Sequence, residues 1–308
     1  MDVVESAAAC RETLDRARAT GRVVGLVPTM GALHDGHTSL MARARAECDV
    51  VAVSIFVNPL QFGDPDDIAR YPRTLGRDLP ACAEAGADLV FVPPVTEMYP
   101  SWPEPPATTV SVSGVSDRWE GASRPGHFDG VATVVSKLFS IAGPCRAYFG
   151  LKDFQQLAVV RRMVLDLCLP VEVVGCPIVR EPDGLALSSR NVRLSGAERR
   201  AATVLSAALA AGRAAIAAGE RSGAAVGRAM RAATSGEPLV ELDYAVAVEA
   251  ASLQEAGAID DAATVRLLVA AQVGPVRLID NSGALARADD SLAAHDVTAQ
   301  VRQLERIG

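Results

Sequence analysis

The chain has 308 residues, 49% of them apolar, which is enough for one large or two modest domains with a sizeable core. Its formal net charge of −7 and its pI near 5.2 argue against a surface that binds nucleic acid. Six cysteines without a CxxC pair, together with no secretory signal pattern, predict a cytoplasmic protein with reduced thiols. The longest apolar runs are about half the length of a membrane span, so we expect no membrane segment.

In the first part of the chain, short apolar runs alternate with amphipathic ones. The runs typical of strands cover residues 23–27, 50–57, 88–92, 146–149 and 171–175. The runs typical of helices cover residues 38–47, 75–85, 131–141 and 154–167. This alternation predicts βαβ units, and therefore an α/β fold with an open parallel sheet of the Rossmann-like type. Ligands of such sheets bind at the carboxyl ends of the strands.

Residues 109–115 alternate polar and apolar side chains, which predicts an edge or flap strand after a Pro-rich loop. Beyond residue 195 the order changes, because helical patterns come first and strands follow. The helical patterns cover 196–218 and 223–233, and the strands cover 244–248, 265–270 and 276–281. We therefore expect a Rossmann-like domain over 1–180, a smaller α+β lid domain over 181–285, and a polar tail over 286–308.

Two histidines frame a glycine in His34-Asp35-Gly36-His37, after the first expected strand and before the first expected helix. A helix start presents backbone N–H groups and the positive end of the helix dipole, so it binds anions. Two imidazoles three residues apart share one side of that turn and can reach a phosphate. This HxGH pattern resembles the signature of the nucleotidyl-transferring α/β superfamily. The alternative is a pair of histidines with a surface or core role.

Two neutral amides, Asn58 and Gln61, follow the second expected strand. Amides bind hydroxyls and carboxylates without adding charge, although an Asn-Pro turn can simply end a strand. The loop at 119–131 places Glu120, Arg124 and His127 among glycines and prolines. Such a loop either binds a ligand or is pinned by an ion pair between Arg124 and Glu120.

Lys152 and Asp153 follow the fourth expected strand, and Lys152 is one of two lysines in a chain with 30 Lys and Arg. The lysine suits a phosphate as a point charge, and the aspartate suits a helix cap or a ribose hydroxyl. At the expected domain junction, Ser188, Ser189 and Arg190 offer two hydroxyls and a guanidinium. These groups fit a triphosphate, although an ordinary polar turn has the same composition.

Six motifs occur along the chain in this order: PTMGALHDGH, FVNPLQFG, YPRT, EGASRPGHFDGV, GLKDFQQ and LSSRN. In order and spacing they resemble the pantothenate synthetase, or pantoate–β-alanine ligase, family over residues 1–282. The resemblance implies an enzyme that uses ATP to condense (R)-pantoate with β-alanine through a pantoyl adenylate, releasing AMP and diphosphate. It also implies Mg²⁺ with the triphosphate, and a homodimer.

The resemblance also implies the site residues. The expected catalytic residues are His34, His37 and Lys152, with His37 assisting the departure of pyrophosphate. Pantoate and β-alanine are expected at Gln61, Gln156 and Asn58. ATP is expected at Met30, Gly31, Ala32, Leu33, His34, Asp35, Gly36, His37, Gly150, Leu151, Lys152, Asp153, Val179, Leu187, Ser188, Ser189 and Arg190. No protein ligand of Mg²⁺ is implied.

Two other kinds of function are compatible with parts of this pattern. A nucleotidyltransferase that keeps the adenylyl group in its product would share HxGH and the junction loop, but not EGASRPGHF or the paired glutamines. A non-catalytic nucleotide-binding or interaction protein would have lost a motif residue, and none is lost here. A tRNA-charging enzyme is disfavoured by the acidic balance of the chain.

Overall fold

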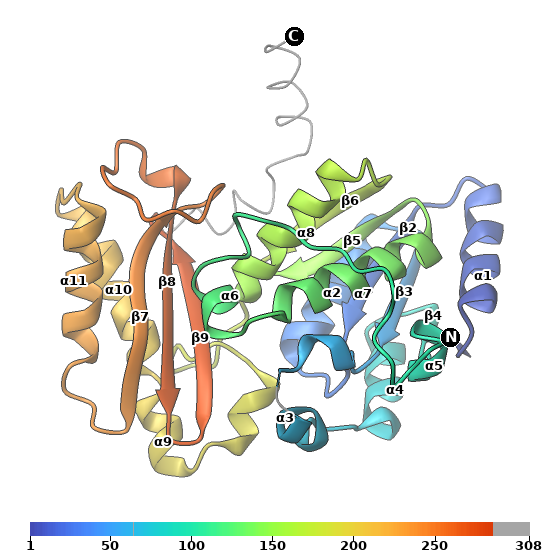
Figure 1. Ribbon diagram of the computed structural model, residues 1–308, viewed down its shortest axis with the longest axis horizontal. Helices are drawn as coiled ribbons and strands as arrows, with labels where there is room; N and C mark the ends of the chain where they lie inside the picture. The colour runs from blue at the N-terminus through green and yellow to red at the C-terminus, as the bar shows by residue number, and fades with distance from the viewer. Residues whose placement is uncertain (64, 286–308) are drawn as a thin grey trace, which may run out of the picture. The chain divides into compact units, whose positions relative to one another are not determined.

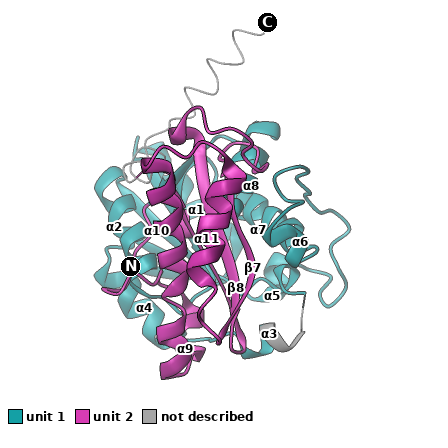
Figure 2. Ribbon diagram, turned by 90° about the vertical axis from the view of Figure 1, so that its left-hand side faces the viewer, with its two compact units in different colours: residues 1–150, 155–176, 295–308 teal, residues 151–154, 177–294 magenta. Residues whose placement is uncertain are grey.

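The computed structural model describes residues 1–63 and 65–285. The predicted polar tail, residues 286–308, lies outside the described residues. Two compact units make up the described chain (Figure 2). The first comprises residues 1–150 and 155–176, and the second comprises residues 151–154 and the described residues from Pro177 on.

Six parallel strands form the sheet of the first unit, in the order β1-β4-β3-β2-β5-β6 (Figure 1). They are β1 (Asp2–Val4), β2 (Val24–Thr29), β3 (Val50–Ile55), β4 (Leu89–Phe91), β5 (Cys145–Gly150) and β6 (Val171–Cys176). The predicted α/β fold with an open parallel sheet is therefore confirmed. The three-residue strand β1 was not predicted, because it is too short to show an alternation.

The helices of the first unit connect these strands. They are α1 (Ala7–Ala19), α2 (Asp35–Glu47), α3 (Pro65–Arg70), α4 (Leu75–Glu84), α5 (Val95–Met98), α6 (Glu120–Ser123), α7 (His127–Ala142) and α8 (Phe154–Asp166). Right-handed crossovers place α2 and α4 on one face of the sheet and α1, α7 and α8 on the other. In agreement, α1 packs against α7 and α2 against α4. Both faces of the sheet are covered, so its strands are almost wholly apolar.

The chain reverses its direction across the sheet between β2 and β5. From β2 it proceeds outward to β3 and β4, whereas β5 lies on the other side of β2 and leads to β6. A crevice at the carboxyl ends of the strands forms at such a switch point, because the two connections leave on opposite faces. The histidine turn follows β2 directly, and the Lys152 turn follows β5 directly. Both motifs are thus placed at the strand ends where this fold binds ligands.

One predicted element of this unit is wrong. Residues 109–115 form no strand, although Val112 is buried as the alternation predicts. The backbone N–H of Val110 donates to the side chain of Thr133 on α7, at 2.9 Å. Gly114 turns the chain with φ of 82°. The alternation therefore reflects docking of a loop onto a helix.

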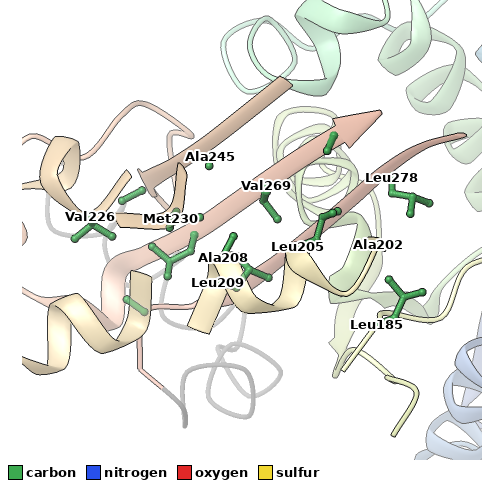
Figure 3. Packing of buried hydrophobic residues seen from close by; sticks show 14 of the residues in the cluster. Leu185, Ala202, Leu205, Ala208, Leu209, Val226, Met230, Ala245, Val269 and Leu278 are labelled. Atoms are coloured by element: carbon green, nitrogen blue, oxygen red, sulfur yellow. The ribbon is translucent and has the colours of Figure 1, made fainter. Parts of the chain in front are cut away.

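The second unit packs two long helices against a three-stranded antiparallel sheet of order β7-β8-β9. Its elements are α9 (Gly196–Ala201), α10 (Val204–Ala217), α11 (Gly223–Thr234), β7 (Val240–Glu249), β8 (Val265–Val273) and β9 (Val276–Gly283). Leu205 and Leu209 of α10 and Met230 of α11 meet Val269 of β8 in the core (Figure 3).

The described residues of the two units also contain short 3-10 turns. They are η1 (Pro59–Gln61), η2 (Leu151–Asp153), η3 (Ser189–Arg193) and η4 (Ala262–Thr264).

The single helix predicted over 196–218 is two helices, because the backbone N–H groups of Thr203 and Leu205 donate three residues back rather than four. Within the described residues, Gly196–Ala217 is the one helical stretch long and apolar enough to cross a membrane by length and composition. Its apolar residues Ala202, Leu205 and Leu209 belong to the buried core of the unit. Its hydrophobicity is therefore explained by packing against the sheet.

Candidate active site

The histidine turn joins β2 to α2, and both histidines take part in capping the helix. His34 is the N-cap residue, and its Nδ1 accepts the backbone N–H of Gly36 at 3.1 Å. Nδ1 of His37, three residues on, accepts the backbone N–H of His34 at 3.3 Å. The two rings lie side by side, with centroids 4.1 Å apart. This reciprocal arrangement is a capping box in which imidazoles replace the usual hydroxyl and carboxylate.

The caps decide where the imidazole protons lie. A neutral histidine has one donor and one acceptor nitrogen, and in both His34 and His37 the acceptor is Nδ1. Nε2 therefore carries the proton in each neutral ring. Both histidines thus present an N–H donor at the positive end of the α2 dipole, which favours an anionic ligand.

Gly36 is required by the close approach of the first ring. A Cβ at this position would lie 2.8 Å from Cε1 and 2.9 Å from Nδ1 of His34, which is closer than a real contact. Any larger residue would push the imidazole away from the helix start. The glycine of HxGH is therefore explained by the fit of the first histidine against the backbone.

A buried carboxylate holds the backbone that precedes the histidines. Oδ2 of Asp78 on α4 accepts the N–H of Ala32 at 3.1 Å, and its Oδ1 accepts the N–H of Leu33 at 3.0 Å. Thr74 at the start of α4 donates its hydroxyl to the same carboxylate. Gly31 and Ala32 have φ of 79° and 51°, which turns these N–H groups toward Asp78. Sequence reasoning missed Asp78, although it lies four residues after the threonine of the YPRT motif.

Asn58 orients Gln61 at the end of β3. Asn58 Nδ2 donates to Gln61 Oε1 at 3.1 Å and to the carbonyl oxygen of Gly130 at 3.0 Å. Its Oδ1 accepts the hydroxyl of Tyr99 at 2.8 Å and the N–H of Leu60 at 3.3 Å. All four hydrogen-bonding positions of this amide are thereby used within the protein. Burial raises the pKa of the Tyr99 phenol, so it stays protonated and donates.

The orientation of Gln61 follows from these contacts. Because its Oε1 accepts from Asn58, its Nε2 points the other way, where it lies 2.8 Å from Sδ of Met30. Met30 is one of the residues expected at the nucleotide. The amide of Gln61 therefore presents N–H donors beside the turn that carries the histidines. Donors of this kind suit a carboxylate or a hydroxyl.

The backbone of Gln61 is held by the loop of the EGASRPGHFDGV motif. Arg124 Nη2 and His127 Nδ1 both reach the carbonyl oxygen of Gln61, at 3.3 and 2.8 Å. Gly130 allows α7 to approach, since a Cβ there would lie 2.2 Å from the carbonyl oxygen of Leu60. The charged loop thus supports Gln61.

Lys152 lies in the turn η2, between β5 and α8. Gly150 ends β5, Leu151 is buried, and the Lys152 ammonium lies 3.5 Å from the carboxylate of Asp153. Helix α8 then begins with Phe154, which the glutamine pair follows. Gln156 is half-buried.

Gln155 is buried and has a different partner set. It binds the carbonyl oxygens of Val115 and Arg118 and the N–H of Glu120. Apart from the doubled glutamine, nothing in the sequence pattern indicates this role.

Val179 and Leu187 face each other across a short hairpin of the second unit. The N–H of Leu187 donates to the carbonyl oxygen of Val179 at 3.0 Å, and Arg180 and Ala186 form an isolated antiparallel bridge. After the hairpin, Ser188 caps η3 by accepting the N–H of Arg190 at 3.3 Å. Ser189 and Arg190 form the first turn of η3. The expected phosphate loop is thus a capped 3-10 turn on a hairpin.

The residues expected to contact ligands fall into four groups of contacts. In the first unit, His34 and His37 bind each other, and Asn58, Gln61 and Met30 form a second hydrogen-bonded group. Lys152, and separately Val179 with the Ser188 turn, belong to the second unit. In the described part of the chain, no group of three or more His, Cys, Asp or Glu side chains could hold a metal ion.

Comparison with known proteins gives the family. The sequence pattern of the family described as pantoate-beta-alanine ligase matches residues 2–283. Pantothenate synthetase of Roseiflexus sp. (strain RS-1) is 56% identical over 257 residues, which cover 83% of this chain and 91% of that protein. The crystal structure of pantothenate synthetase from Thermus thermophilus superimposes with a TM-score of 0.86 at 49% identity, covering 92% of this chain and 99% of that one.

A third relative carries ligands. Pantoate-beta-alanine ligase from Francisella tularensis, complexed with beta-gamma ATP and beta-alanine, matches with a TM-score of 0.73 at 31% identity, covering 92% of this chain and 98% of that one. The match extends through both units. The chain therefore belongs to the pantoate–β-alanine ligase family.

Proposed function

We propose that this enzyme condenses (R)-pantoate with β-alanine, using ATP, at the carboxyl ends of β2 and β5. The observation that carries the proposal is the pair of Nε2–H donors at the start of α2, fixed by the two Nδ1 caps. The Francisella tularensis relative, which was crystallised with an ATP compound and β-alanine, supports the choice of substrates.

The first step forms a pantoyl adenylate. A carboxylate oxygen of pantoate attacks the α-phosphorus of ATP, and the bond from that phosphorus to the bridging oxygen of pyrophosphate breaks. Negative charge builds up on the departing pyrophosphate, where donors placed beforehand stabilise it. We assign this role to His34 and His37, with His37 as the acid, and to the Lys152 ammonium.

The second step forms the amide. The neutral amine of β-alanine attacks the activated carbonyl of the adenylate, AMP leaves with the electrons of the broken acyl–oxygen bond, and the amine loses a proton. Gln61 and Gln156 hold pantoate by its hydroxyls and carboxylate, and Gln61 also borders the place of β-alanine. Asn58 acts by orienting Gln61. The protein contributes mainly position and charge neutralisation.

The remaining nucleotide contacts involve the turn after β2, the turn after β5 and the hairpin that joins Val179 to Leu187. The N–H groups of Ala32 and Leu33 already bind Asp78, so a nucleotide along Met30–Leu33 meets other atoms of that segment. Asp35 and Gly36 border the phosphates at the start of α2. Gly150, Leu151 and Asp153 border the nucleotide beside Lys152, as does Val179, and Leu187, Ser188, Ser189 and Arg190 bind the outer phosphates. Residues 181–285 form the lid domain in this scheme.

Mg²⁺ enters with the triphosphate as part of the substrate. We assign no protein ligand to the ion. We further propose a cytoplasmic homodimer, on the family resemblance. Light scattering coupled to gel filtration measures the mass, and a monomer at micromolar concentration contradicts that part.

A coupled assay for AMP tests the function. The enzyme is given ATP, Mg²⁺, pantoate and β-alanine, and each component is omitted in turn. We expect AMP and pyrophosphate in equal amounts only when all components are present. The rival adenylyl transferase would retain the adenylyl group in its product, so pyrophosphate without free AMP in the complete mixture would reject the ligase.

A further inference from the structure

Two consecutive residues of β9, Asp280 and Asn281, are buried polar residues, each 3% exposed. They are paired in the ladder with Val269 and Leu268 of β8. Successive residues of a strand point to opposite faces of the sheet. The two side chains therefore serve segments on different faces, and each segment carries residues expected at ATP.

Asn281 binds the turn that carries Lys152. Its Nδ2 donates to the carbonyl oxygens of Leu151 at 3.0 Å and of Lys152 at 2.7 Å. Its Oδ1 accepts Nε and Nη2 of Arg266, at 2.8 and 2.5 Å. Because a guanidinium only donates, the amide cannot be turned around. The side chain must offer an acceptor on one side and two donors on the other, which an aspartate cannot do.

Arg266 adds a second attachment between the sheet and the segment that carries Lys152. It is fully buried, and its guanidinium lies 4.6 Å from the centre of the Phe154 ring, the residue that begins α8. A cation stacked on an aromatic face in a dry environment is firmly placed. The turn Leu151–Asp153 is thus attached to the sheet at its carbonyl oxygens and at the residue that follows it.

Asp280 binds the hairpin on the other face. Its carboxylate accepts Nη1 and Nη2 of Arg180, at 2.6 and 3.0 Å, and the N–H of Asn281 at 2.8 Å. Arg180 also donates to the carbonyl oxygens of Gly184 and Asn281. It follows Val179 directly and lies opposite Ala186, in the hairpin whose second arm leads into Ser188–Arg190.

We propose that Asp280 and Asn281 are positioning residues for the triphosphate: they fix the Lys152 turn and the 187–190 loop to one strand at a constant spacing. The inference rests on the proposed function, since it concerns the same ATP site. All contacts that carry it lie within the second unit. Because both attachments are to one strand, the Lys152 turn and the 187–190 loop can bind one triphosphate without reorganisation at the moment of reaction.

The test replaces the donors of Asn281 and keeps its shape. Asn281→Asp removes Nδ2 but keeps an oxygen for Arg266, and Asp280→Asn weakens the hold on Arg180 should the first variant fail to fold. We expect each to lower the affinity for a non-hydrolysable ATP analogue by about tenfold, with AMP affinity within about twofold. Pantoate-dependent exchange of pyrophosphate into ATP falls in parallel. Amide formation from preformed pantoyl adenylate stays unchanged, because that step involves no outer phosphates.

Ser282→Ala is the matched control. Ser282 is the next residue of β9, similarly buried, and its hydroxyl has no hydrogen-bond partner among the described residues. This variant should leave both half-reactions unchanged. Equal losses in both half-reactions of Asn281→Asp, or unchanged affinity for the ATP analogue, would overturn the inference.

Lys152→Ala, measured alongside, distinguishes failure of the proposed function from failure of the inference. If Asn281 acts through Lys152, the double variant binds the analogue no more weakly than Lys152→Ala alone, because contacting residues are not additive. Additive losses would reject the coupling. If Lys152→Ala itself leaves ATP affinity normal, the proposed role of Lys152 fails, and the inference with it. If Asn281→Asp binds the ATP analogue normally while Lys152→Ala binds it weakly, the inference is rejected and the proposed function stands.

Discussion

The two turns that carry the proposed phosphate-binding side chains are held in different ways. The turn after β2 is fixed by its own histidine caps and by Asp78, 45 and 46 residues away in the same unit. The turn after β5 is fixed by Asn281, 129 and 130 residues further along. The first turn is therefore set by its own caps and by one carboxylate of the same unit, whereas the second depends on the completed sheet of the second unit.

This difference has a consequence for both function and folding. Local contacts form with a small loss of chain entropy, while contacts across long loops require more of the chain to be ordered first. Damage to the first turn should act on chemistry or on its own unit. The second turn can also be disturbed by a substitution at Asn281, which we do not expect to contact the nucleotide. Substitutions in each turn test this difference.

The largest expected effect comes from His37→Ala in the first turn. It removes the Nε2–H donor proposed to assist pyrophosphate, so adenylate formation should fall by about 10² to 10⁴-fold. It also removes one capping contact, which should lower the free energy of unfolding by only about 1 kcal/mol. Rapid-quench measurement of pyrophosphate release, beside a urea titration, separates the two effects. Unchanged release would exclude His37 from the chemistry.

Lys152→Ala in the second turn should have the next largest effect. One ammonium serves both bound ATP and the departing pyrophosphate, so KM for ATP rises and kcat falls together, for a combined loss of about 10² in kcat/KM. Lys137→Ala is the control, because Lys137 is the other lysine of the chain and lies over the Tyr99 ring at 5.8 Å. Normal values of both constants in Lys152→Ala would remove this residue from the site.

These two residues were found from the sequence, because strand, turn and helix patterns placed them. The period-2 and period-3.6 patterns predicted five of the six strands of the first sheet, and their order implied a parallel sheet. Residues 109–115 show the limit of this reasoning, since a loop lying on α7 has the same alternation as a strand. The break at Ala202 was hidden in the same way, because both helices are rich in alanine.

The supporting residues could not be found from the sequence. Asp78 looks like an ordinary helix-start carboxylate, and Asp280 and Asn281 look like a polar strand end. Their partners lie tens to more than a hundred residues away, and only the folded chain brings them together. Motif spacing indicates the residues proposed to touch ligands, whereas the residues that support those side chains are recognisable only by burial and by hydrogen-bond partners.

Asp78→Asn tests the support of the first turn. The amide would turn a donor toward the N–H groups of Ala32 and Leu33, which lose their charged acceptor. We expect the free energy of unfolding to fall by about 2 to 4 kcal/mol, with a loss of about tenfold in kcat/KM for ATP. Denaturant titration measures the first quantity. Asp166→Asn, which breaks an exposed pair with Arg162, should change stability by less than about 0.5 kcal/mol. Equal stability of the two variants would show that Asp78 is dispensable for the turn.

Tyr99→Phe should have the smallest effect. It tests whether supporting hydrogen bonds in the first unit also position Gln61, the residue assigned to pantoate. The change removes the hydroxyl that donates to Asn58 Oδ1, so the Asn58 amide is less firmly oriented and Gln61 with it. The free energy of unfolding should fall by about 1 kcal/mol, the usual net value of one hydrogen bond. KM for pantoate should rise by about threefold, while KM for ATP serves as the internal control and stays constant, since Gln61 is assigned to pantoate. Steady-state kinetics with each substrate varied in turn gives both constants. An equal rise in both would mean that Asn58 and Gln61 support the turn at Met30 as a whole, and that the division between a nucleotide part and a pantoate part of the first unit is wrong.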